Sequence, residues 1–342
     1  ALPICLILLF LPLAGGLGRP AVAAGALLAA ISPALTYYSR FYIQESLFAF
    51  FALAFLIALG RYVQRPGMTA AAGAGVCAGL AYATKETSVI VVFAALVAAL
   101  LARVPRGRIL AGLSAHAAGA ALGLATALAT AFVFYSSFLR QPAGFLESIR
   151  AFSIYVDRGV SAGAHTEPWD YYLRLLSFSS SGGLVWTEGL VLALAIVGTV
   201  AAARRSAGYW PRVVALYAWI AAIAFSAIRY KTPWNLLPFY VGFVLLAGMG
   251  AAVLIDGART RVRRALVVIV LIGAAGQLGL QNWRANARYP ADPRNPYVYA
   301  QTSPDLLRLT QRIADVSAFH PDRTQMLVKV VAGPYEQWPL PW

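Results

Sequence analysis

The stretch "AAAGAGVCAGLAYATKETSVIVVFAALVAALLA", Ala70–Ala102, decides how the rest of the chain is organised. It carries no charge except the adjacent Lys85 and Glu86 at its middle. One helix over these 33 residues would be about 50 Å long, whereas the hydrocarbon core of a bilayer is roughly 30 Å thick. The flanking segments 61–65 and 103–108 both carry arginines. We therefore predict a helical hairpin with its tip at Lys85 and Glu86, and with Glu86 in the first turn of the second helix.

The composition of the whole chain indicates an all-α polytopic membrane protein. Of its 342 residues 60% are hydrophobic and 12% charged, whereas soluble domains average about 45–50% and 25%. We predict about ten membrane spans, at residues 1–18, 20–37, 46–60, 69–84, 87–102, 109–135, 184–203, 212–228, 233–255 and 265–281. The net charge of +15 could suggest a nucleic-acid partner. Much of it lies in short loops between apolar runs, however, so we expect the lipid bilayer as the partner and no nucleic acid.

The connecting segments are of two alternating kinds, which orients the predicted bundle. Short arginine-rich loops form one set, and the positive-inside rule places them in the cytoplasm. The other set comprises "YYSRFYIQE", "TKE", residues 136–183, "RYKTP" and the tail from residue 282. If all ten runs cross, every acidic residue except Asp256 falls on this second, outer side. The alternation is therefore self-consistent.

The outer loop and the tail carry predicted structure of their own. In the outer loop 136–183, Phe145–Tyr155 has the apolar spacing of an amphipathic helix on the membrane surface, and Pro168 is expected to start a further helix. In the tail, "NPYVYAQ" and "QMLVKVVAG" predict strands around a helix capped by Ser303, with Pro304 at its first position and Asp305 in its first turn. We therefore predict a transmembrane domain over 1–281 and the start of a small extracytoplasmic α/β domain over 282–342.

Charged side chains near a membrane face are candidates for function. On the predicted outer side these are Arg40, Glu45, Lys85, Glu86, His165, Glu167, Asp170, Arg229 and Lys231. A lipid-linked sugar phosphate needs Arg or Lys for its phosphate and a carboxylate or His as base for its acceptor. Both kinds of group are present. No Gly-rich phosphate loop or zinc-type spacing occurs, and Cys5 and Cys77 give neither a disulfide framework nor a metal pattern.

Structural roles compete with each of these functional interpretations. Glu45 and Arg40 could form an interfacial ion pair. The hairpin tip could be a turn from which Lys85 snorkels to the headgroups, and a helix-start carboxylate explains Glu86 without chemistry. Arg229 and Lys231 could be interfacial anchors. His165 could be an ordinary loop residue.

Four segments resemble the repeated signatures of GT-C-type membrane glycosyltransferases: "SPALTYYSRFYIQESLFAFF", "GLAYATKETSVI", "HTEPWDYYLRLL" and "KTPWNLLPFY". The branch most similar to them contains protein-mannosyltransferase-like and aminoarabinose-transferase-like proteins. Within it, the prokaryotic family named for an archaeal flippase-associated glycosylation protein is the most similar, through "KTPWNLL" and the terminal "WPLPW". The resemblance runs in order over nearly the whole chain.

The resemblance implies an inverting transferase of the prokaryotic plasma membrane that uses a polyprenyl-phosphate-linked hexose or pentose at the extracytoplasmic face. By position, it implies Glu45 and His165 as catalytic residues. Arg40, Lys85, Arg229 and Lys231 would suit the donor phosphate, and Glu167 and Asp170 the acceptor or loop. The acceptor, which could be protein, lipid or glycan, stays open, and so does a divalent metal, for which no ligands can be assigned.

The sequence departs from this family in one respect. The family carries an acidic motif in the loop after its first span, and that loop is missing here. We therefore expect the sequence as printed to be a fragment without transferase activity.

Two other functions stay open at this point. The protein could be a transporter or flippase component of lipid-linked glycan export, although no inverted repeat is evident. It could also be a scaffold of an export complex. A transferase predicts that Glu45, Lys85, His165 and either Arg229 or Lys231 converge on one outer cavity.

Overall fold

The computed structural model describes residues 2–41, 43–102, 109–160, 165–299 and 305–331, and in these residues it is mostly helical. The N-terminal half contains α1 (Leu2–Leu8), η1 (Leu11–Leu13), α2 (Ala14–Leu17), α3 (Arg19–Ile31), α4 (Pro33–Arg40), α5 (Glu45–Gln64), α6 (Met68–Thr84), α7 (Ser88–Ala102), α8 (Ile109–Tyr135) and α9 (Ala143–Val160). The second half contains α10 (Tyr171–Ser177), β1 (Ser179–Ser181), β2 (Leu184–Trp186), α11 (Gly189–Ala203), α12 (Tyr209–Ala227), η3 (Pro233–Leu236), α13 (Leu237–Gly257), α14 (Arg261–Trp283), η4 (Arg284–Arg288), α15 (Asp305–Phe319) and η5 (Arg323–Gln325). β1 and β2 form a small antiparallel hairpin.

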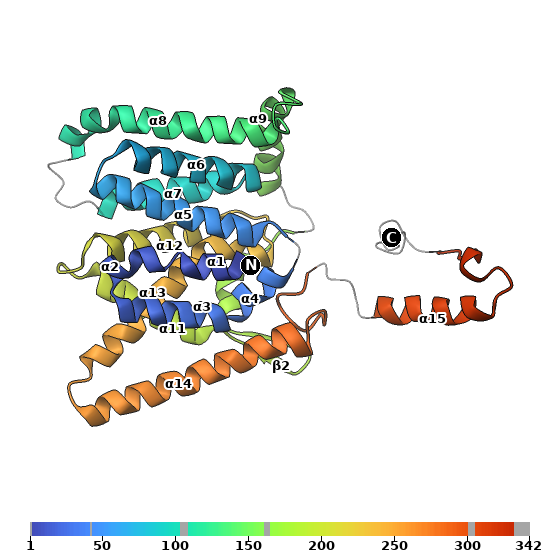
Figure 1. Ribbon diagram of the computed structural model, residues 1–342. Coiled ribbons are helices and arrows are strands. Elements are labelled where there is room, and N and C mark those ends of the chain that lie inside the picture. Colours follow the sequence, from blue (N-terminus) through green and yellow to red (C-terminus); the bar gives the residue numbers. More distant parts are fainter. Residues whose placement is uncertain (1, 42, 103–108, 161–164, 300–304, 332–342) are drawn as a thin grey trace.

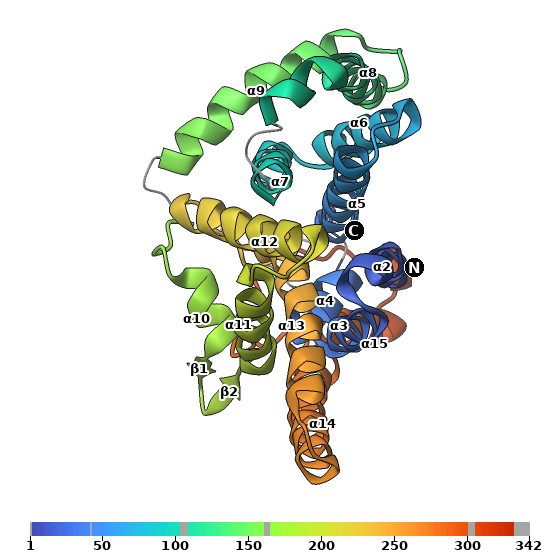
Figure 2. The same cartoon turned by 90° about the vertical axis from the view of Figure 1, so that its left-hand side faces the viewer.

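Helix α13 is the central column of the bundle, and α3, α5, α11 and α12 pack around it (Figures 1 and 2). Every residue from Leu237 to Ala251 is buried. Glycines let the backbones approach, as is common between membrane helices. A Cβ built on Gly248 would lie 2.2 Å from the carbonyl of Ala21, and one on Gly198 would lie 2.0 Å from that of Leu246. Close packing of the central column therefore depends on these small residues.

The predicted hairpin forms. Helix α6 ends at Thr84 and α7 begins at Ser88, so the break falls at the adjacent charges. The prediction that Glu86 lies in the first turn of α7 is wrong, because Glu86 precedes that helix by two residues. Lys85 occupies the C-cap of α6 and is half-buried, which places a cation at a helix C-terminus.

A proline accounts for the main difference between the predicted apolar spans and the helices of the structure. The predicted span 20–37 is a pair of helices, α3 and α4, bent by 57°. Ser32 caps α4, with its Oγ accepting from Leu35 N at 3.3 Å, and Pro33 stands at the first helical position. Proline cannot donate the backbone hydrogen bond that would continue α3. The chain therefore turns at Ser32.

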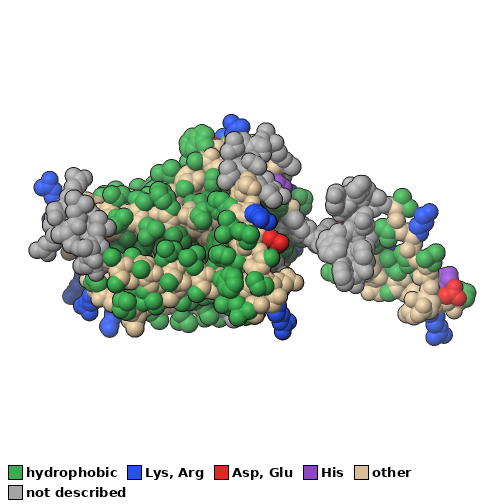
Figure 3. All heavy atoms as spheres, turned by 90° about the horizontal axis from the view of Figure 1, so that it is seen from above, with side chains coloured by type: hydrophobic (Ala, Val, Ile, Leu, Met, Phe, Trp, Pro, Cys, Tyr) green, Lys and Arg blue, Asp and Glu red, His purple; other side chains and the backbone are tan. Residues whose placement is uncertain are grey.

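The chain is a multi-pass membrane protein. In the described residues, five helical segments are long and apolar enough to cross a bilayer: Glu45–Gln64, Ala117–Tyr135, Tyr209–Ala227, Pro233–Gly257 and Arg261–Arg288. The bent pair α3–α4 would be a sixth, and four further apolar helices are shorter. Each of the ten predicted runs contains helix, but ten crossings remain a prediction. Hydrophobic side chains cover the bundle face seen in Figure 3, and Lys and Arg gather toward its two ends.

The outer loop is helical as expected, with one correction. Helix α9 contains the predicted amphipathic segment. Pro168 does not start the next helix: α10 begins at Tyr171, and the Pro168 carbonyl accepts from the Tyr171 amide in the turn before it.

The tail departs further from the prediction. Helix α15 forms, but residues 295–299 make turns, and 326–331 pair with no strand in the described part of the chain. The predicted basic loop at 103–108, Ser303, Pro304 and the terminal "WPLPW" lie outside the described residues. The first of the two predicted strands fails because Asn295 and Tyr297, 0% and 1% exposed, turn inward to hydrogen-bond partners. The division into two domains at residue 281 stays a prediction.

Candidate functional site

A buried ion pair joins three helix ends at the predicted outer end of the bundle. Lys85 Nζ lies 2.7 Å from Glu45 Oε1 and donates to Asn235 Oδ1 at 2.6 Å. The side chains of Glu45 and Lys85 are 4% and 14% exposed. Glu45 stands in the first turn of α5, where the helix dipole favours an anion. The predicted alternative of an Arg40–Glu45 pair is therefore wrong.

A short backbone pairing places the second group of candidates. Residues 165–167 of the outer loop run antiparallel to 229–231, the segment that links α12 to η3. The Lys231 amide donates to the His165 carbonyl at 3.0 Å, and the Glu167 amide donates to the Arg229 carbonyl at 3.1 Å. This pairing holds four of the predicted site residues side by side, although they come from segments more than 60 positions apart.

Lys231 is buried, and its ammonium group donates hydrogen bonds to two backbone carbonyls of the described residues. Lys231 as a whole is 2% exposed. Its Nζ donates to the carbonyl of Glu167 at 3.1 Å and to that of Ile228. Removal from water disfavours the ammonium and lowers the pKa of Lys231, and the negative charge of Glu167 opposes this shift. Arg229, by contrast, is exposed.

A row of aromatic rings joins His165 to the region of the ion pair. The His165 ring lies 5.1 Å from that of Tyr230 and 5.5 Å from that of Tyr299, centroid to centroid. Tyr299 lies 5.0 Å from Trp234, and Trp234 lies 6.2 Å from Tyr38. Because Trp234 directly precedes Asn235, the row ends beside the partner of Lys85. The structure therefore brings both groups of candidates to the segment 229–235.

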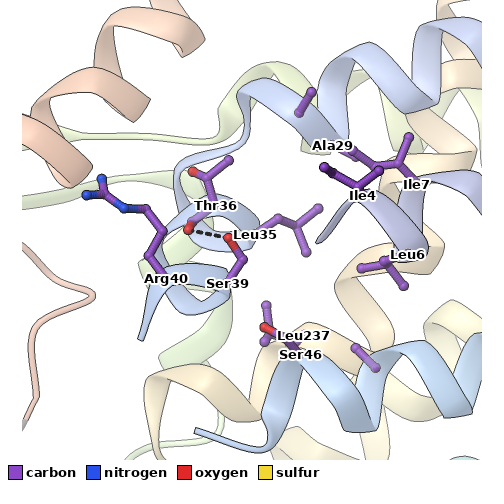
Figure 4. Close-up of a pocket in the computed structure, with 12 residues that line it drawn as sticks. Ile4, Leu6, Ile7, Ala29, Leu35, Thr36, Ser39, Arg40, Ser46 and Leu237 are labelled. Atoms are coloured by element: carbon purple, nitrogen blue, oxygen red, sulfur yellow. Dashed lines mark hydrogen bonds between the residues drawn. The ribbon is translucent and has the colours of Figure 1, made fainter. Parts of the chain in front are cut away.

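Arg40 is placed apart, at the rim of a separate apolar pocket. Its Nη1 donates to the carbonyl of Asn286 at 2.7 Å. The pocket beside it has a volume of about 300 Å³ and lies between α1, α3, α4, α5 and α13. Figure 4 shows Thr36 and Ser39 on the same side as Arg40, with Ile4, Leu6 and Ile7 opposite. Ser46 also lines it, one residue after Glu45, so the first turn of α5 separates this pocket from the ion pair.

The remaining predicted residues take structural positions. Asp170 stands at the N-cap of α10 and pairs with Arg174 at 2.7 Å, and its other oxygen, Oδ1, is buried without a hydrogen bond among the described residues. Glu86 is half-buried in the turn before α7. Among the residues that the structure describes, no group of three His, Cys, Asp or Glu side chains could hold a metal ion.

Sequence reasoning missed Glu188, the carboxylate with the most hydrogen bonds among the described residues. It is 0% exposed and stands at the N-cap of α11. Its Oε1 accepts from the Ala34 amide at 2.6 Å and from the Tyr297 hydroxyl at 3.0 Å, and its Oε2 accepts from Ser32 at 2.8 Å and from Tyr240. A lone acid immediately before the apolar run 189–203 was the signal in the sequence.

Glu188 also anchors residues 289–299, which we call the tail strap. Hydroxyls of Tyr37 and Tyr38 donate to strap carbonyls at 2.7 and 2.9 Å, and Trp186 Nε1 donates to a third at 2.8 Å. Tyr297 donates to Glu188, as described above. The strap therefore lies fixed across the ends of α4 and α11, and it delivers Tyr299 to His165.

The comparisons with known proteins agree with this architecture. The sequence model of the dolichyl-phosphate-mannose-protein mannosyltransferase family matches residues 2–135. No curated protein matches the sequence. The structure is similar to that of ArnT from Cupriavidus metallidurans bound to undecaprenyl phosphate, with a TM-score of 0.60 and 20% identity over 81% of this chain and 49% of that one.

A second similar structure is the archaeal oligosaccharyltransferase AglB from Archaeoglobus fulgidus, in complex with an inhibitory peptide and a dolichol-phosphate. Its TM-score is 0.55 with 14% identity, over 94% of this chain and 47% of that one. The present chain thus spans about half the length of the solved structures it matches. It has the GT-C-like fold of these membrane proteins, and residues 2–135 are similar to the dolichyl-phosphate-mannose-protein mannosyltransferase family.

Proposed function

We propose that the protein is an inverting glycosyltransferase that moves a sugar from a polyprenyl-phosphate donor to an acceptor at the extracytoplasmic face. The observation that carries this proposal is the buried Glu45–Lys85 pair with Asn235, at one end of a GT-C-like bundle. Asn235 belongs to the same segment, 229–235, as Lys231, whose amide donates to the His165 carbonyl. A structure with this fold was solved with undecaprenyl phosphate, and another with a dolichol-phosphate. Both ligands present an anion at the membrane surface.

The cations suit the donor phosphate in this proposal. Lys85 is 14% exposed at its side chain and can turn from Glu45 to a phosphate oxygen. Arg229 is exposed, and its backbone belongs to the pairing of 165–167 with 229–231. Charge-assisted hydrogen bonds to phosphate are roughly twice as strong as neutral ones. Lys85 and Arg229 can therefore bind the phosphate of the sugar donor in competition with water. The apolar pocket beside Arg40 offers room for part of the hydrocarbon chain.

The ion pair gives the donor a second role. In the inverting reaction, the acceptor oxygen forms a bond to the anomeric carbon while the bond from that carbon to the phosphate oxygen breaks. The acceptor proton passes to a base, for which Glu45 and His165 are the candidates. A phosphate that binds Lys85 competes with Glu45 for the ammonium. Donor binding would thereby release the Glu45 carboxylate close to the reacting centre, so that the base becomes available when the donor is present.

The experiment is transfer of a labelled sugar from a polyprenyl-phosphate donor by the full-length protein in vesicles. We expect transfer in the wild type and a loss of at least about 100-fold in Lys85→Ala and in Glu45→Gln. Lys329→Ala is the matched control, because Lys329 is an exposed lysine far from the pair in sequence. Wild-type vesicles that translocate the lipid-linked sugar without transferring it would instead support a transporter or flippase role.

A further inference from the structure

The tail strap ends at the ring of His165, and the donor and the acceptor of the hydrogen bond made there can be assigned. The Tyr299 hydroxyl bonds His165 Nδ1, and the other ring nitrogen, Nε2, is farther away at 3.4 Å. Desolvation, together with Tyr230 and Glu167, raises the pKa of Tyr299, so its hydroxyl keeps its proton. A phenol is a stronger hydrogen-bond donor than a neutral imidazole N–H, and the bare imidazole nitrogen is the stronger acceptor. The hydroxyl therefore donates to Nδ1.

This direction determines which nitrogen carries the imidazole proton. When Nδ1 accepts, the neutral ring bears its hydrogen on Nε2. His165 then presents a donor to the site and has no free lone pair for an acceptor proton. We propose that Tyr299 is a positioning residue that holds His165 in the Nε2–H tautomer, so that His165 hydrogen-bonds an anionic phosphate and leaves Glu45 as the base. The part of this inference that assigns His165 to a phosphate rests on the proposed function.

The strap supplies the rigidity that such control requires. Tyr299 follows Tyr297 by two residues, and Tyr297 is 1% exposed and bonded to the fully buried Glu188. Within the strap, Asn295 Oδ1 accepts from the Tyr297 amide at 3.1 Å, and Asn295 Nδ2 donates to the Tyr289 carbonyl at 2.9 Å. On its other side Tyr299 packs edge-on against Trp234. The hydroxyl is thus held from two directions, by the strap and by the aromatic row.

The charged and titratable groups around His165 come from three segments. Glu167 is two residues away in the same loop, and the backbone of Lys231 donates to the His165 carbonyl. Tyr230 lies against the ring from the 229–231 segment, and Tyr299 from the strap. Of the groups that contact its ring, only the Tyr299 hydroxyl has a hydrogen bond to a ring nitrogen among the described residues. A change at Tyr299 should therefore alter the tautomer of His165 more than a change at Tyr230.

The test is nitrogen NMR of the full-length protein, labelled at histidine and reconstituted in nanodiscs. The sequence has three histidines, and His165→Asn identifies the signal of His165. We expect a single Nε2–H tautomer in the wild type. Tyr299→Phe keeps the ring but removes the donor to the neutral imidazole, so the Nδ1–H tautomer should appear beside the Nε2–H tautomer. Tyr297→Phe should mix the two tautomers to a smaller extent.

Tyr230→Phe is the matched control, because it removes a hydroxyl beside the same ring without removing a bond to a ring nitrogen. An unchanged spectrum in Tyr299→Phe, or an equal change in Tyr230→Phe, would overturn the inference. In the transfer assay, Tyr299→Phe should lower kcat about tenfold with KM unchanged. If the full-length protein transfers no sugar, the proposed function fails, whereas the NMR spectra still decide the tautomer.

Discussion

The Glu45–Lys85 pair allows a quantitative test of how the bundle is held together. Removing one partner of a buried ion pair leaves an uncompensated charge and costs about 3–5 kcal/mol. Glu45 is the more deeply buried partner, with 4% of its side chain exposed against 14% for Lys85. Lys85→Met, which strands the carboxylate, should therefore destabilise the protein more than Glu45→Gln, which leaves Lys85 its bond to Asn235 at 2.6 Å.

The magnitudes follow from these differences in burial. We expect a loss of about 3 kcal/mol for Lys85→Met and about 2 kcal/mol for Glu45→Gln, because Lys85 keeps a neutral partner and some contact with water. The double variant removes both charges, and well-matched neutral groups often replace a buried pair at little cost. It should therefore lose only about 1–2 kcal/mol, so that the coupling energy between the two sites is about 3–4 kcal/mol.

The assay is thermal unfolding of the three variants and the wild type in one detergent at fixed pH. Lys329→Met is the control for the loss of a lysine, and its unfolding should match the wild type. If the double variant loses the sum of the two single losses, the two side chains do not act as a pair and the reasoning fails. The same result would also weaken the idea that donor phosphate competes with Glu45 for Lys85.

Three further predictions concern the bundle, the strap anchor and the buried lysine. Gly248→Ala should cost about 1–3 kcal/mol in thermal unfolding, because the added Cβ meets a backbone carbonyl of α3. The control is Gly276→Ala, whose Cβ would meet nothing within 4 Å, and equal losses in the two variants would contradict the packing account. Glu188→Ala should lower the free energy of unfolding by at least about 3 kcal/mol, since four donors lose their acceptor. It should also make the tail strap more sensitive to protease, and an unchanged cleavage rate would show that the strap has another anchor. Burial lowers the pKa of Lys231, so the unfolded chain binds more protons between that lowered pKa and the ordinary value of 10.5. Thermal stability should therefore rise with pH across that window, and a rise of equal size in Lys231→Met would refute this assignment, with Lys329→Met as the control.

The sequence predicts those parts of the fold that depend on local pattern. Apolar length against bilayer thickness, together with the arginines on both flanks, is sufficient for the α6–α7 hairpin. The same reasoning finds helix in every apolar run, because a backbone in lipid must satisfy its own hydrogen bonds. It does not reveal the bend between α3 and α4 without attention to Pro33. There, a single residue overrides an otherwise continuous apolar pattern.

The failures arise where distant partners decide the local structure. Residues 295–299 have the composition of a strand, yet Asn295 and Tyr297 find acceptors in the bundle and in the strap itself, and the chain turns to reach them. Glu188 was not among the candidates, because its four donors lie far from it in the sequence. For the site, the pattern selected Glu45, Lys85, His165 and Lys231, and their convergence on one outer cavity stays a prediction. The pattern did not select Asn235 and Tyr299, the partners of Lys85 and His165, which lie 150 and 134 positions away.

The bend between α3 and α4 makes two distant positions interdependent. A helix that restarts in the middle of a bundle has amide groups without acceptors, and little water is present there to supply them. The Ala34 amide and the Ser32 hydroxyl both turn to Glu188, a residue 154 positions after Ala34. Variation at this bend and at Glu188 should consequently be correlated. A sequence that replaces Pro33 and straightens the helix would leave a buried carboxylate short of donors, and a sequence that loses Glu188 would favour the straight helix.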